Sequence, residues 1–205
     1  MLIEQDSYLG GVLKNSNKVK TINGSTPQEW ISETEELILN SKNITILKNT
    51  LVTTYNFTNH LIALEDKFAG KKIDLNKSEL TLHKIRTSNT IIANGHIERF
   101  ISFRNNDLPG VMLASSFEKY IHRYGVVPEK EPVIFTNNSS SLSLLKTLIS
   151  LGCKPKAYVD SRRKDNIETE IKKILKDKEI PFFSDAEIEG CDGNKKVETI
   201  TIRQG

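Results

Sequence analysis

Residues 133–160 have the sequence VIFTNNSSSLSLLKTLISLGCKPKAYVD, which contains the clearest structural signal in the chain. Val133-Ile134-Phe135 predicts a short buried strand, and Ala157-Tyr158-Val159-Asp160 predicts a second strand that ends in an acid. Between them, Asn137-Asn138-Ser139 can cap a helix whose end is marked by Gly152. This pattern predicts a strand–helix–strand unit of about 30 residues. The buried stripe of its helix should contain Leu142, Leu145, Leu148 and Ile149.

The N-terminal part predicts a related arrangement. Leu2-Ile3-Glu4 is typical of a buried strand that ends in an acid, and Gly10-Gly11 follows after a short polar loop. Thr26-Pro27-Gln28-Glu29 forms a capping box with proline at the first helical position, so a helix should begin here and end near Asn40-Ser41. Residues 43–48 predict the next strand. The helix should pack one apolar face against a sheet, and this face holds Trp30, Ile31, Thr34, Leu37 and Ile38.

Residues 50–92 have a different pattern. Short stretches of β-forming residues are separated by Asn, Gly and Lys turns, which predicts an antiparallel meander. Its last run, Thr90-Ile91-Ile92, predicts a buried strand that stops at Asn94-Gly95. Because glycine allows the chain to turn close to a partner, we expect Gly95 to lie in a ligand-facing turn.

The remaining segments complete an α/β pattern. Residues 111–124 and 165–178 predict helices. Further strands are expected near residues 181–183, 186–189 and 197–202, with the last two forming a hairpin. The alternation of strands and helices around an inserted meander predicts an α/β fold with a parallel sheet, truncated at both ends.

The composition indicates an ordinary globular protein. The 205 residues, 37% hydrophobic and 27% charged, suit one or two soluble domains. No apolar run approaches the roughly 20 residues of a membrane span and no export signal precedes the first strand, so we expect a cytoplasmic protein without a membrane contact. The net charge is +3 and the basic clusters are short, which argues against nucleic-acid binding. Cys153 and Cys191 lack the paired spacing of metal sites, so we expect free thiols and no metal.

The candidate polar residues have both a functional and a structural interpretation. Glu4 has the setting of an acid that binds ribose hydroxyls about 20 residues after a glycine-rich phosphate turn, but no such turn precedes it, and acids also simply end strands. Glu98-Arg99 can hold a loop as an ion pair, or bind an anion through the arginine. Asn137, Asn138 and Ser139 can bind an anion, although capping is favoured. Catalytic residues are not assigned, because no nucleophile motif stands beside His60, His96 or His122.

Several ordered stretches resemble a known family. Residues 93–99 are similar to the pattern ATGxxERP, residues 106–115 to NDxPGVMLA, residues 123–126 to NRYGV and residues 133–138 to VVFTNND. Together they resemble the alpha subunit of heterotetrameric sarcosine oxidase, over an interior part of that subunit. Related amine and opine dehydrogenase and cyanide synthase subunits share parts of the pattern. The sequence departs from it at Asn94, Phe100 and Ser139.

The resemblance implies a FAD/NAD(P)-binding, two-dinucleotide-binding-type fold. Residues 1–126 would be the remainder of the first dinucleotide-binding domain, without its glycine-rich turn and with the β-meander near residues 50–92. Residues 127–205 would be an incomplete second nucleotide-binding-like subdomain. The family's alpha subunit holds NAD, and motif matching places Glu4, Gln5 and Asp6 at the adenosine ribose, Val12 beside the cofactor and Val52 at the adenine. With Gly95, the expected cofactor-binding residues are therefore Glu4, Gln5, Asp6, Val12, Val52 and Gly95.

The resemblance also implies a reaction for the whole complex. Sarcosine would be oxidatively demethylated to glycine with formation of hydrogen peroxide, and the one-carbon unit would pass to tetrahydrofolate. The flavins, FAD and FMN, would lie mainly on or with the beta subunit, and the partners would be the beta, gamma and delta subunits. This chain would bind NAD and its partners without carrying the oxidation itself. The alternatives are a subunit of a related flavin-dependent amine, proline or opine dehydrogenase, and a non-catalytic remnant or subunit-interaction module.

Overall fold

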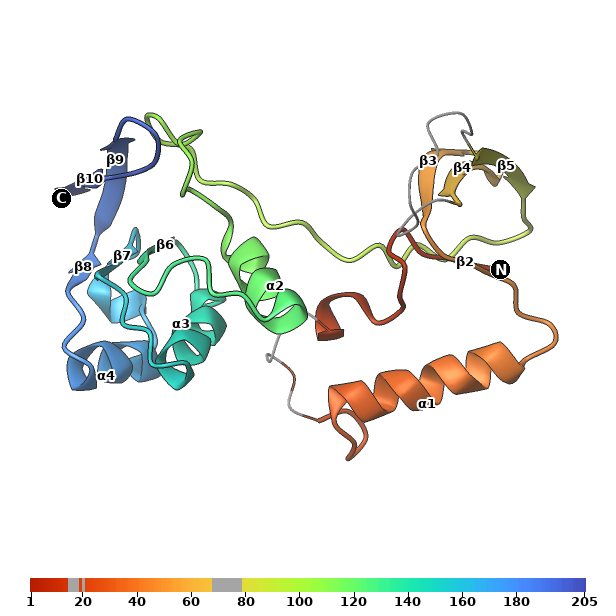
Figure 1. Cartoon of the computed structure of the whole chain (residues 1–205), viewed down its shortest axis with the longest axis horizontal. Coiled ribbons are helices and arrows are strands. Elements are labelled where there is room, and N and C mark those ends of the chain that lie inside the picture. Colours follow the sequence, from red (N-terminus) through yellow and green to blue (C-terminus); the bar gives the residue numbers. More distant parts are fainter. Residues whose placement is uncertain (15–18, 20, 68–78) are drawn as a thin grey trace. The chain divides into compact units, whose positions relative to one another are not determined.

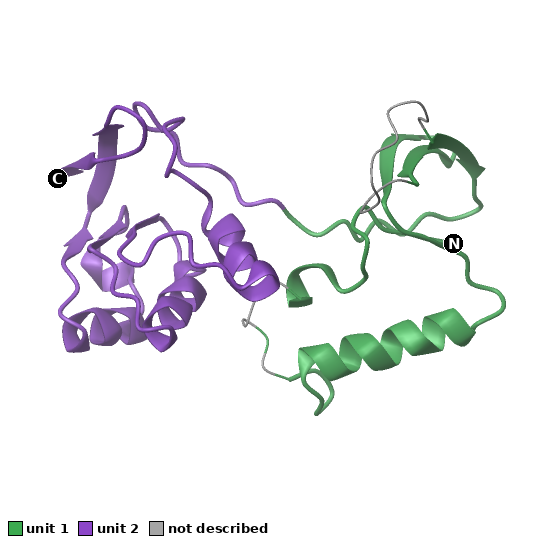
Figure 2. Ribbon diagram, in the orientation of Figure 1, with its two compact units in different colours: residues 1–14, 19–96 green, residues 15–18, 97–205 purple. Residues whose placement is uncertain are grey.

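The structure is a computed structural model that describes residues 1–14, 19, 21–67 and 79–205. The described chain divides into two compact units (Figure 2). The first contains residues 1–14 and the described residues between 19 and 96, and the second contains residues 97–205. The boundary expected from the sequence lay after residue 126, whereas residues 97–126 belong to the second unit.

The first unit begins with two short parallel strands joined through a helix (Figure 1). Leu2 pairs with Ile46 and Ile3 with Leu47, which confirms the strand predicted within residues 43–48. The capping box is also confirmed, because Thr26 Oγ1 accepts the Glu29 N–H at 3.3 Å and the Glu29 carboxylate accepts the Thr26 N–H at 2.9 Å. The elements are β1 (Leu2–Ile3), the 3₁₀ helix η1 (Gly11–Lys14), α1 (Pro27–Asn40) and β2 (Ile46–Leu47).

The expected apolar face of α1 is buried only near its beginning. Ile31 is buried and lies against the backbone of Gly10, where a Cβ would meet the Ile31 Cδ1 at 2.8 Å. Leu37, in contrast, is 71% exposed. The expectation for Leu37 was wrong, because the packing of α1 on the glycine turn is made through Ile31, near the beginning of the helix, and does not cover Leu37.

The second part of the first unit is an antiparallel three-stranded sheet, which confirms the meander. Its strands are β3 (Thr50–Asn56), β4 (His60–Asp66) and β5 (Leu80–Arg86), and residues 68–78 of the expected meander lie outside the described residues. The buried strand expected at residues 90–92 is wrong, since Ile91 is 92% exposed and the strand ends at Arg86. Arg86 pairs with His60, the first residue of β4, so residues 90–92 have no strand left to pair with.

The second unit contains the strand–helix–strand signal, which is confirmed. A parallel sheet has the order β6-β7-β8, with Ile134 opposite Tyr158 and Tyr158 opposite Phe182. Each crossover carries a helix, as parallel neighbours require. The elements are β6 (Val133–Thr136), α3 (Ser141–Ser150), β7 (Ala157–Asp160), the 3₁₀ helix η2 (Lys164–Asn166), α4 (Thr169–Asp177) and β8 (Phe182–Ser184).

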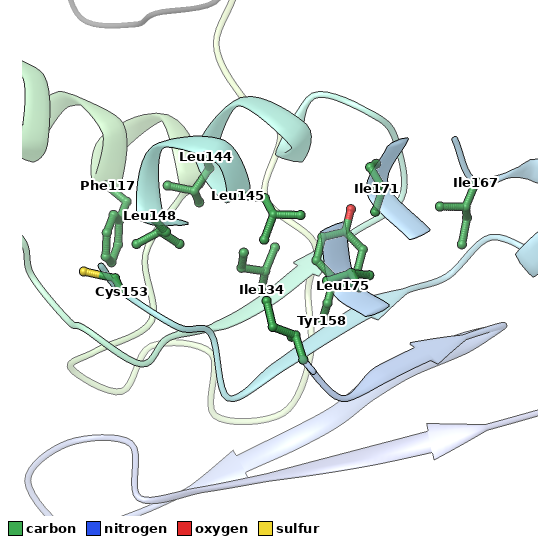
Figure 3. Close-up of a cluster of buried hydrophobic side chains, with 11 residues drawn as sticks. Phe117, Ile134, Leu144, Leu145, Leu148, Cys153, Tyr158, Ile167, Ile171 and Leu175 are labelled. Atoms are coloured by element: carbon green, nitrogen blue, oxygen red, sulfur yellow. The ribbon is translucent and has the colours of Figure 1, made fainter. Parts of the chain in front are cut away.

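Three helices pack on this sheet through one hydrophobic core (Figure 3). Besides α3 and α4, the third is α2 (Ala114–Tyr124), whose Phe117 joins the core. This contact explains why residues 97–126 fall in the second unit. The most deeply buried side chains of the core are Leu145, Leu148, Tyr158, Ile171 and Leu175. None of the described helices is long and apolar enough to cross a membrane.

A β-hairpin completes the second unit and confirms the prediction for the C-terminal residues. It pairs β9 (Ala186–Asp192) with β10 (Thr199–Gln204) in antiparallel register. The preceding chain docks on it, because Arg104 N donates to Glu189 O and Cys191 N donates to Arg104 O. Arg104 therefore forms an isolated parallel bridge with Gly190 of β9.

Candidate functional site

The first candidate site lies at the carboxyl end of β1. Glu4 is fixed on both sides, since its N–H donates to Leu47 O and its carbonyl accepts the Thr50 N–H, each at 2.9 Å. Its Oε1 accepts the backbone N–H of Asp6 at 2.9 Å. This bond orients the carboxylate, and no residue in the described part of the chain donates to Oε2, which can therefore accept hydroxyl groups. A ribose-binding acid likewise follows the carboxyl end of a parallel strand, the second strand of a dinucleotide fold.

The glycine turn that follows β1 has a backbone that only glycine adopts readily. Gly10 has φ of +103° and faces Ile31 so closely that any Cβ would collide with it. Val12, which comes next in η1, is 60% exposed. The absence of a side chain at Gly10 therefore allows α1 to pack against the turn. The apolar side chain of Val12 remains exposed a few residues after the end of β1.

The structure brings together only part of the residue set expected for a cofactor. Hydrogen bonds join Glu4 to Asp6 and Thr50, and Val52 follows two residues later on β3 with its side chain partly exposed. No hydrogen bond within the described part of the chain joins Glu4 to Val12, Val52 or Gly95. Gln5 and Gly95 are exposed, and Gly95 lies with φ of +68° in the irregular segment after β5.

The second candidate site lies at the carboxyl ends of β6 and β7. A groove of about 270 Å³ opens there, and its polar lining comes from Ser102, Asn137, Ser161 and Glu187. In open α/β sheets, ligands bind outside the carboxyl ends of the strands, so this groove occupies the expected place for a ligand. Its apolar lining consists of Ile101, Phe135 and Ile188.

Beside this groove, the acid that ends β7 is completely buried. Asp160 is 0% exposed, and its Oδ1 accepts the Arg162 backbone N–H at 2.9 Å and the Arg162 Nε–H at 3.0 Å. Its Oδ2 accepts the Arg162 Nη2–H at 2.8 Å. The hydrogen bond to Asp160 also raises the pKa of Arg162, so its guanidinium stays charged.

The start of α3 is fixed by a second buried contact. The hydroxyls of Ser141 and Tyr158 lie 2.7 Å apart, and burial raises the pKa of Tyr158 to about 12. The phenol is therefore neutral and serves as a hydrogen-bonding partner. The helix begins at Ser141 and its N-cap is Ser140, which makes no side-chain cap hydrogen bond, so the prediction that residues 137–139 cap this helix is wrong. Asn138 instead accepts the Ser140 N–H at 2.9 Å within the preceding loop.

Glu98 has a structural role that the sequence analysis did not identify. Its carboxylate accepts the backbone N–H groups of Ala114 at 3.3 Å and Ser115 at 2.7 Å, at the start of α2. The helix's own N-cap residue, Leu113, has no side chain that can accept these bonds. The absence of a capping residue before a helix beginning near Ala114 was the available signal for a distant cap.

Arg104 and Asn105 attach the segment before α2 to the hairpin within the second unit. Arg104 forms a bidentate pair with Asp192, at 2.9 and 3.0 Å, and this contact lowers the pKa of Asp192. Asn105 Nδ2 donates to Cys191 O at 2.9 Å, and the Cys191 Sγ–H donates to Asn105 O at 3.0 Å. Burial raises the pKa of Cys191, so its thiol is a poor nucleophile.

The histidines and cysteines form no catalytic arrangement in the described part of the chain. His96 is exposed, and His60 Nδ1 lies 3.0 Å from Thr58 Oγ1. His83, which the sequence analysis did not single out, pairs with Glu65 across two strands at 2.8 Å. Cys153 and Cys191 are both free and buried. Among the described residues, no cluster of His, Cys, Asp and Glu is arranged to hold a metal ion.

Comparisons with known proteins reveal relatives of one kind. No family model matches the chain. It is 28% identical over 208 residues to the sarcosine oxidase subunit alpha of Rhizobium meliloti (strain 1021), a match that covers 100% of this chain and 20% of the relative. The chain is thus similar in sequence to sarcosine oxidase alpha subunits. The alpha subunit of Corynebacterium sp. (strain U-96) is also 28% identical, over 80% of this chain and 17% of its own length. The chain thus spans about a fifth of the length of these relatives.

Comparison with solved structures confirms the fold class. Thioredoxin reductase of T. acidophilum matches with a TM-score of 0.62 and 13% identity, over 98% of this chain and 61% of that chain. A NAD-dependent persulfide reductase of A. fulgidus matches with a TM-score of 0.58 and 13% identity, over 98% and 37% of the respective chains. The fold is that of FAD/NAD(P)-binding oxidoreductases, with both parallel and antiparallel sheets.

Proposed function

We propose that this chain is the NAD-binding module of a sarcosine oxidase alpha-type subunit. The observation that carries the proposal is the position of Glu4, which ends β1 with one carboxylate oxygen fixed by Asp6 and the other available. Two ribose hydroxyls can donate to such a carboxylate, whereas a 2′-phosphate would be repelled. NAD is therefore the preferred cofactor, and its expected contacts are Glu4, Gln5, Asp6, Val12, Val52 and Gly95.

The residues of the first unit fit the adenosine end of NAD better than its pyrophosphate. In the first unit a phosphate could meet the N-terminus of α1, but the capping box already bonds the N–H groups of Thr26 and Glu29, and Pro27 has no N–H. We expect the affinity for NAD to depend mainly on the ribose and adenine contacts. Bound NAD would supply its redox-active nicotinamide, while Glu4 holds and orients the ribose.

The relatives' name supports a specific reaction for the whole assembly. We propose that a complex containing this chain oxidises sarcosine to glycine in the cytoplasm, with hydrogen peroxide as a product and tetrahydrofolate as the one-carbon acceptor. Its partners would be beta, gamma and delta subunits, with FAD and FMN held mainly on or with the beta subunit. In that complex, this chain binds nucleotide and partner subunits and does not carry out the oxidation.

The alternative enzyme is a flavin-dependent amine, proline or opine dehydrogenase subunit. Turnover of proline or an opine instead of sarcosine by the purified complex would favour it. The non-enzymatic alternative is a remnant or interaction module that no longer binds nucleotide. Failure of the chain to bind NAD at millimolar concentration would support this alternative.

Calorimetric titration of the full chain with NAD and NADP tests the proposal. We expect NAD to bind more tightly than NADP, and Glu4→Gln to reduce that preference because the repulsion of the 2′-phosphate is removed. Glu4→Ala should weaken NAD binding by about 10- to 100-fold, since hydrogen bonds to a charged acceptor are lost. Glu36→Ala, which changes an exposed acid on α1, is the matched control. Equal NAD affinities for Glu4→Ala and Glu36→Ala would contradict the role of Glu4.

A further inference from the structure

The second unit also contains an acid at the carboxyl end of a parallel strand. Asp160 ends β7, the second strand of the β6–α3–β7 arrangement, where this fold places the acid that binds ribose. Unlike Glu4, Asp160 is completely buried, and both of its carboxylate oxygens accept hydrogen bonds from Arg162. The position that would face a ribose is therefore occupied by a side chain of the same molecule.

The guanidinium of Arg162 has no remaining hydrogen-bonding capacity. An arginine side chain carries five N–H donors. Nε–H and one Nη2–H donate to Asp160, Nη1 donates to Ser139 Oγ at 3.1 Å and to Asn166 O at 3.3 Å, and Nη2 also reaches Glu168 Oε2 at 3.5 Å. Ser139 belongs to the β6–α3 loop, which stands where a glycine-rich phosphate turn would be. The guanidinium thus joins this loop to the end of β7 and to the segment before α4.

The neighbouring groove is also unsuited to a dinucleotide. Its lining contains the carboxylate of Glu187 and no basic side chain. That acid already pairs with Arg203 at 3.0 Å, so a pyrophosphate entering the groove would meet no basic side chain among the lining residues. The composition of the groove lining is independent of the Arg162 contacts, and it too argues against dinucleotide binding in the second unit.

We infer that Arg162 takes, in the second unit, the place that the ribose and phosphates of a dinucleotide take in this fold, so that Asp160 and Ser139 form a closed structural centre. Arg162 is a positioning residue: it holds the β6–α3 loop in place of a bound ligand. The second unit then serves as a permanently ordered scaffold. This inference stands independently of the proposed NAD site in the first unit.

Nuclear magnetic resonance of the full chain tests the closed centre directly. We expect the Arg162 Nε–H to exchange with solvent at least about tenfold more slowly than that of Arg203, an exposed arginine that pairs with Glu187 through Nη2, because exchange requires local opening. Exchange of the Arg162 Nε–H as fast as that of Arg203 would overturn the inference.

A matched pair of substitutions separates the role of the guanidinium from that of charge. Arg162→Lys keeps the positive charge but cannot form the forked contacts, so the amides of Ser139, Ser140 and Ser141 should exchange faster. Arg163→Lys changes the exposed neighbour and should leave these amides unchanged. Equal behaviour of the two variants would overturn the inference. Because both variants keep a cation, the comparison does not require the Asp160 carboxylate to be left unpaired.

Addition of millimolar NAD distinguishes this inference from the proposed function. NAD should leave the signals of Ser139 and Arg162 in place, whether or not it shifts the amides of Glu4 and Asp6. A shift at Glu4 alone supports both proposals, and no shift at either place overturns the NAD proposal only. A shift or loss of protection at Arg162 overturns the closed centre.

Discussion

The carboxylate of Glu98 accepts a hydrogen bond of 2.7 Å from the backbone N–H of Ser115, 17 residues further along the chain. Together with the bond from Ala114, it neutralises the start of α2, where the helix dipole also favours a negative charge. Glu98, which belongs to the motif at residues 93–99, therefore caps α2, which begins at the end of the motif at residues 106–115. The two motifs that carried the resemblance are joined physically as well as by their order.

Removal of this cap should destabilise the second unit. We expect Glu98→Ala to lower the free energy of unfolding by about 1 kcal/mol, the usual effect of losing an N-terminal cap. Urea unfolding followed by circular dichroism measures the change. Glu198→Ala, which removes an exposed acid without a capping contact, is the control. Equal losses in the two variants would show that Glu98 does not cap α2.

The core of the second unit should be sensitive to the loss of volume at Leu145. This side chain is fully buried between α3 and the sheet, so Leu145→Ala should cost about 2–5 kcal/mol of unfolding free energy. Leu151, just beyond the same helix, is 48% exposed, and Leu151→Ala should cost much less. Thermal or urea unfolding of both variants provides the comparison. A loss below that of Leu151→Ala would contradict the described core.

The stabilisation that the contact between Arg104 and Asp192 provides should be lost at acidic pH. Because the arginine lowers the pKa of Asp192, the carboxylate stabilises the folded hairpin above its ordinary pKa of about 3.9, and this contribution is lost as the pH falls through the lower folded value. A carbon-detected pH titration should give an Asp192 midpoint below that of an unpaired aspartate. In Arg104→Gln the midpoint should rise towards the ordinary value. An identical midpoint with and without Arg104 would contradict the pairing.

The thiol of Cys191 should react slowly in the folded chain. It is buried, its pKa is raised by that burial, and it donates to Asn105 O. In a Cys153→Ser background, a thiol reagent should react on the order of a hundredfold more slowly with the folded chain than with the urea-unfolded chain. Reaction of the folded chain at the unfolded rate would place Cys191 on the surface.

Local signals made the regular elements predictable. The helix beginning at Pro27 has a short-range capping box, and the unit from Val133 to Asp160 has apolar periodicity and turn residues that agree with one another. Thr90-Ile91-Ile92 has the composition of a strand, but a strand also needs a neighbour, and β4 begins opposite Arg86. Leu37 similarly fits the helical stripe, although its burial depends on how far a packing partner extends along α1.

The candidate site was predictable in position and less so in contacts. Glu4 and Asp160 were visible as acids at strand ends because three apolar residues precede each of them. Two hydrogen bonds could not be predicted, the one between Arg162 and Ser139 and the one between Ser115 and Glu98. Their partners are 23 and 17 residues apart, and no helical or strand periodicity links residues at such separations. Only the folded chain shows that one acid is available and the other is enclosed.

The enclosure of Asp160 also restricts how the chain can change. Replacement of Arg162 alone leaves a carboxylate buried without its partner, and replacement of Asp160 alone leaves a guanidinium with lost acceptors; either change is costly. A route to a second nucleotide site must therefore alter both positions together and open the β6–α3 loop as well. Across related sequences, we expect Asp160 and Arg162 to be retained or replaced together. The ligand of the first unit could then change while Arg162 continues to fill the ligand position of the second unit.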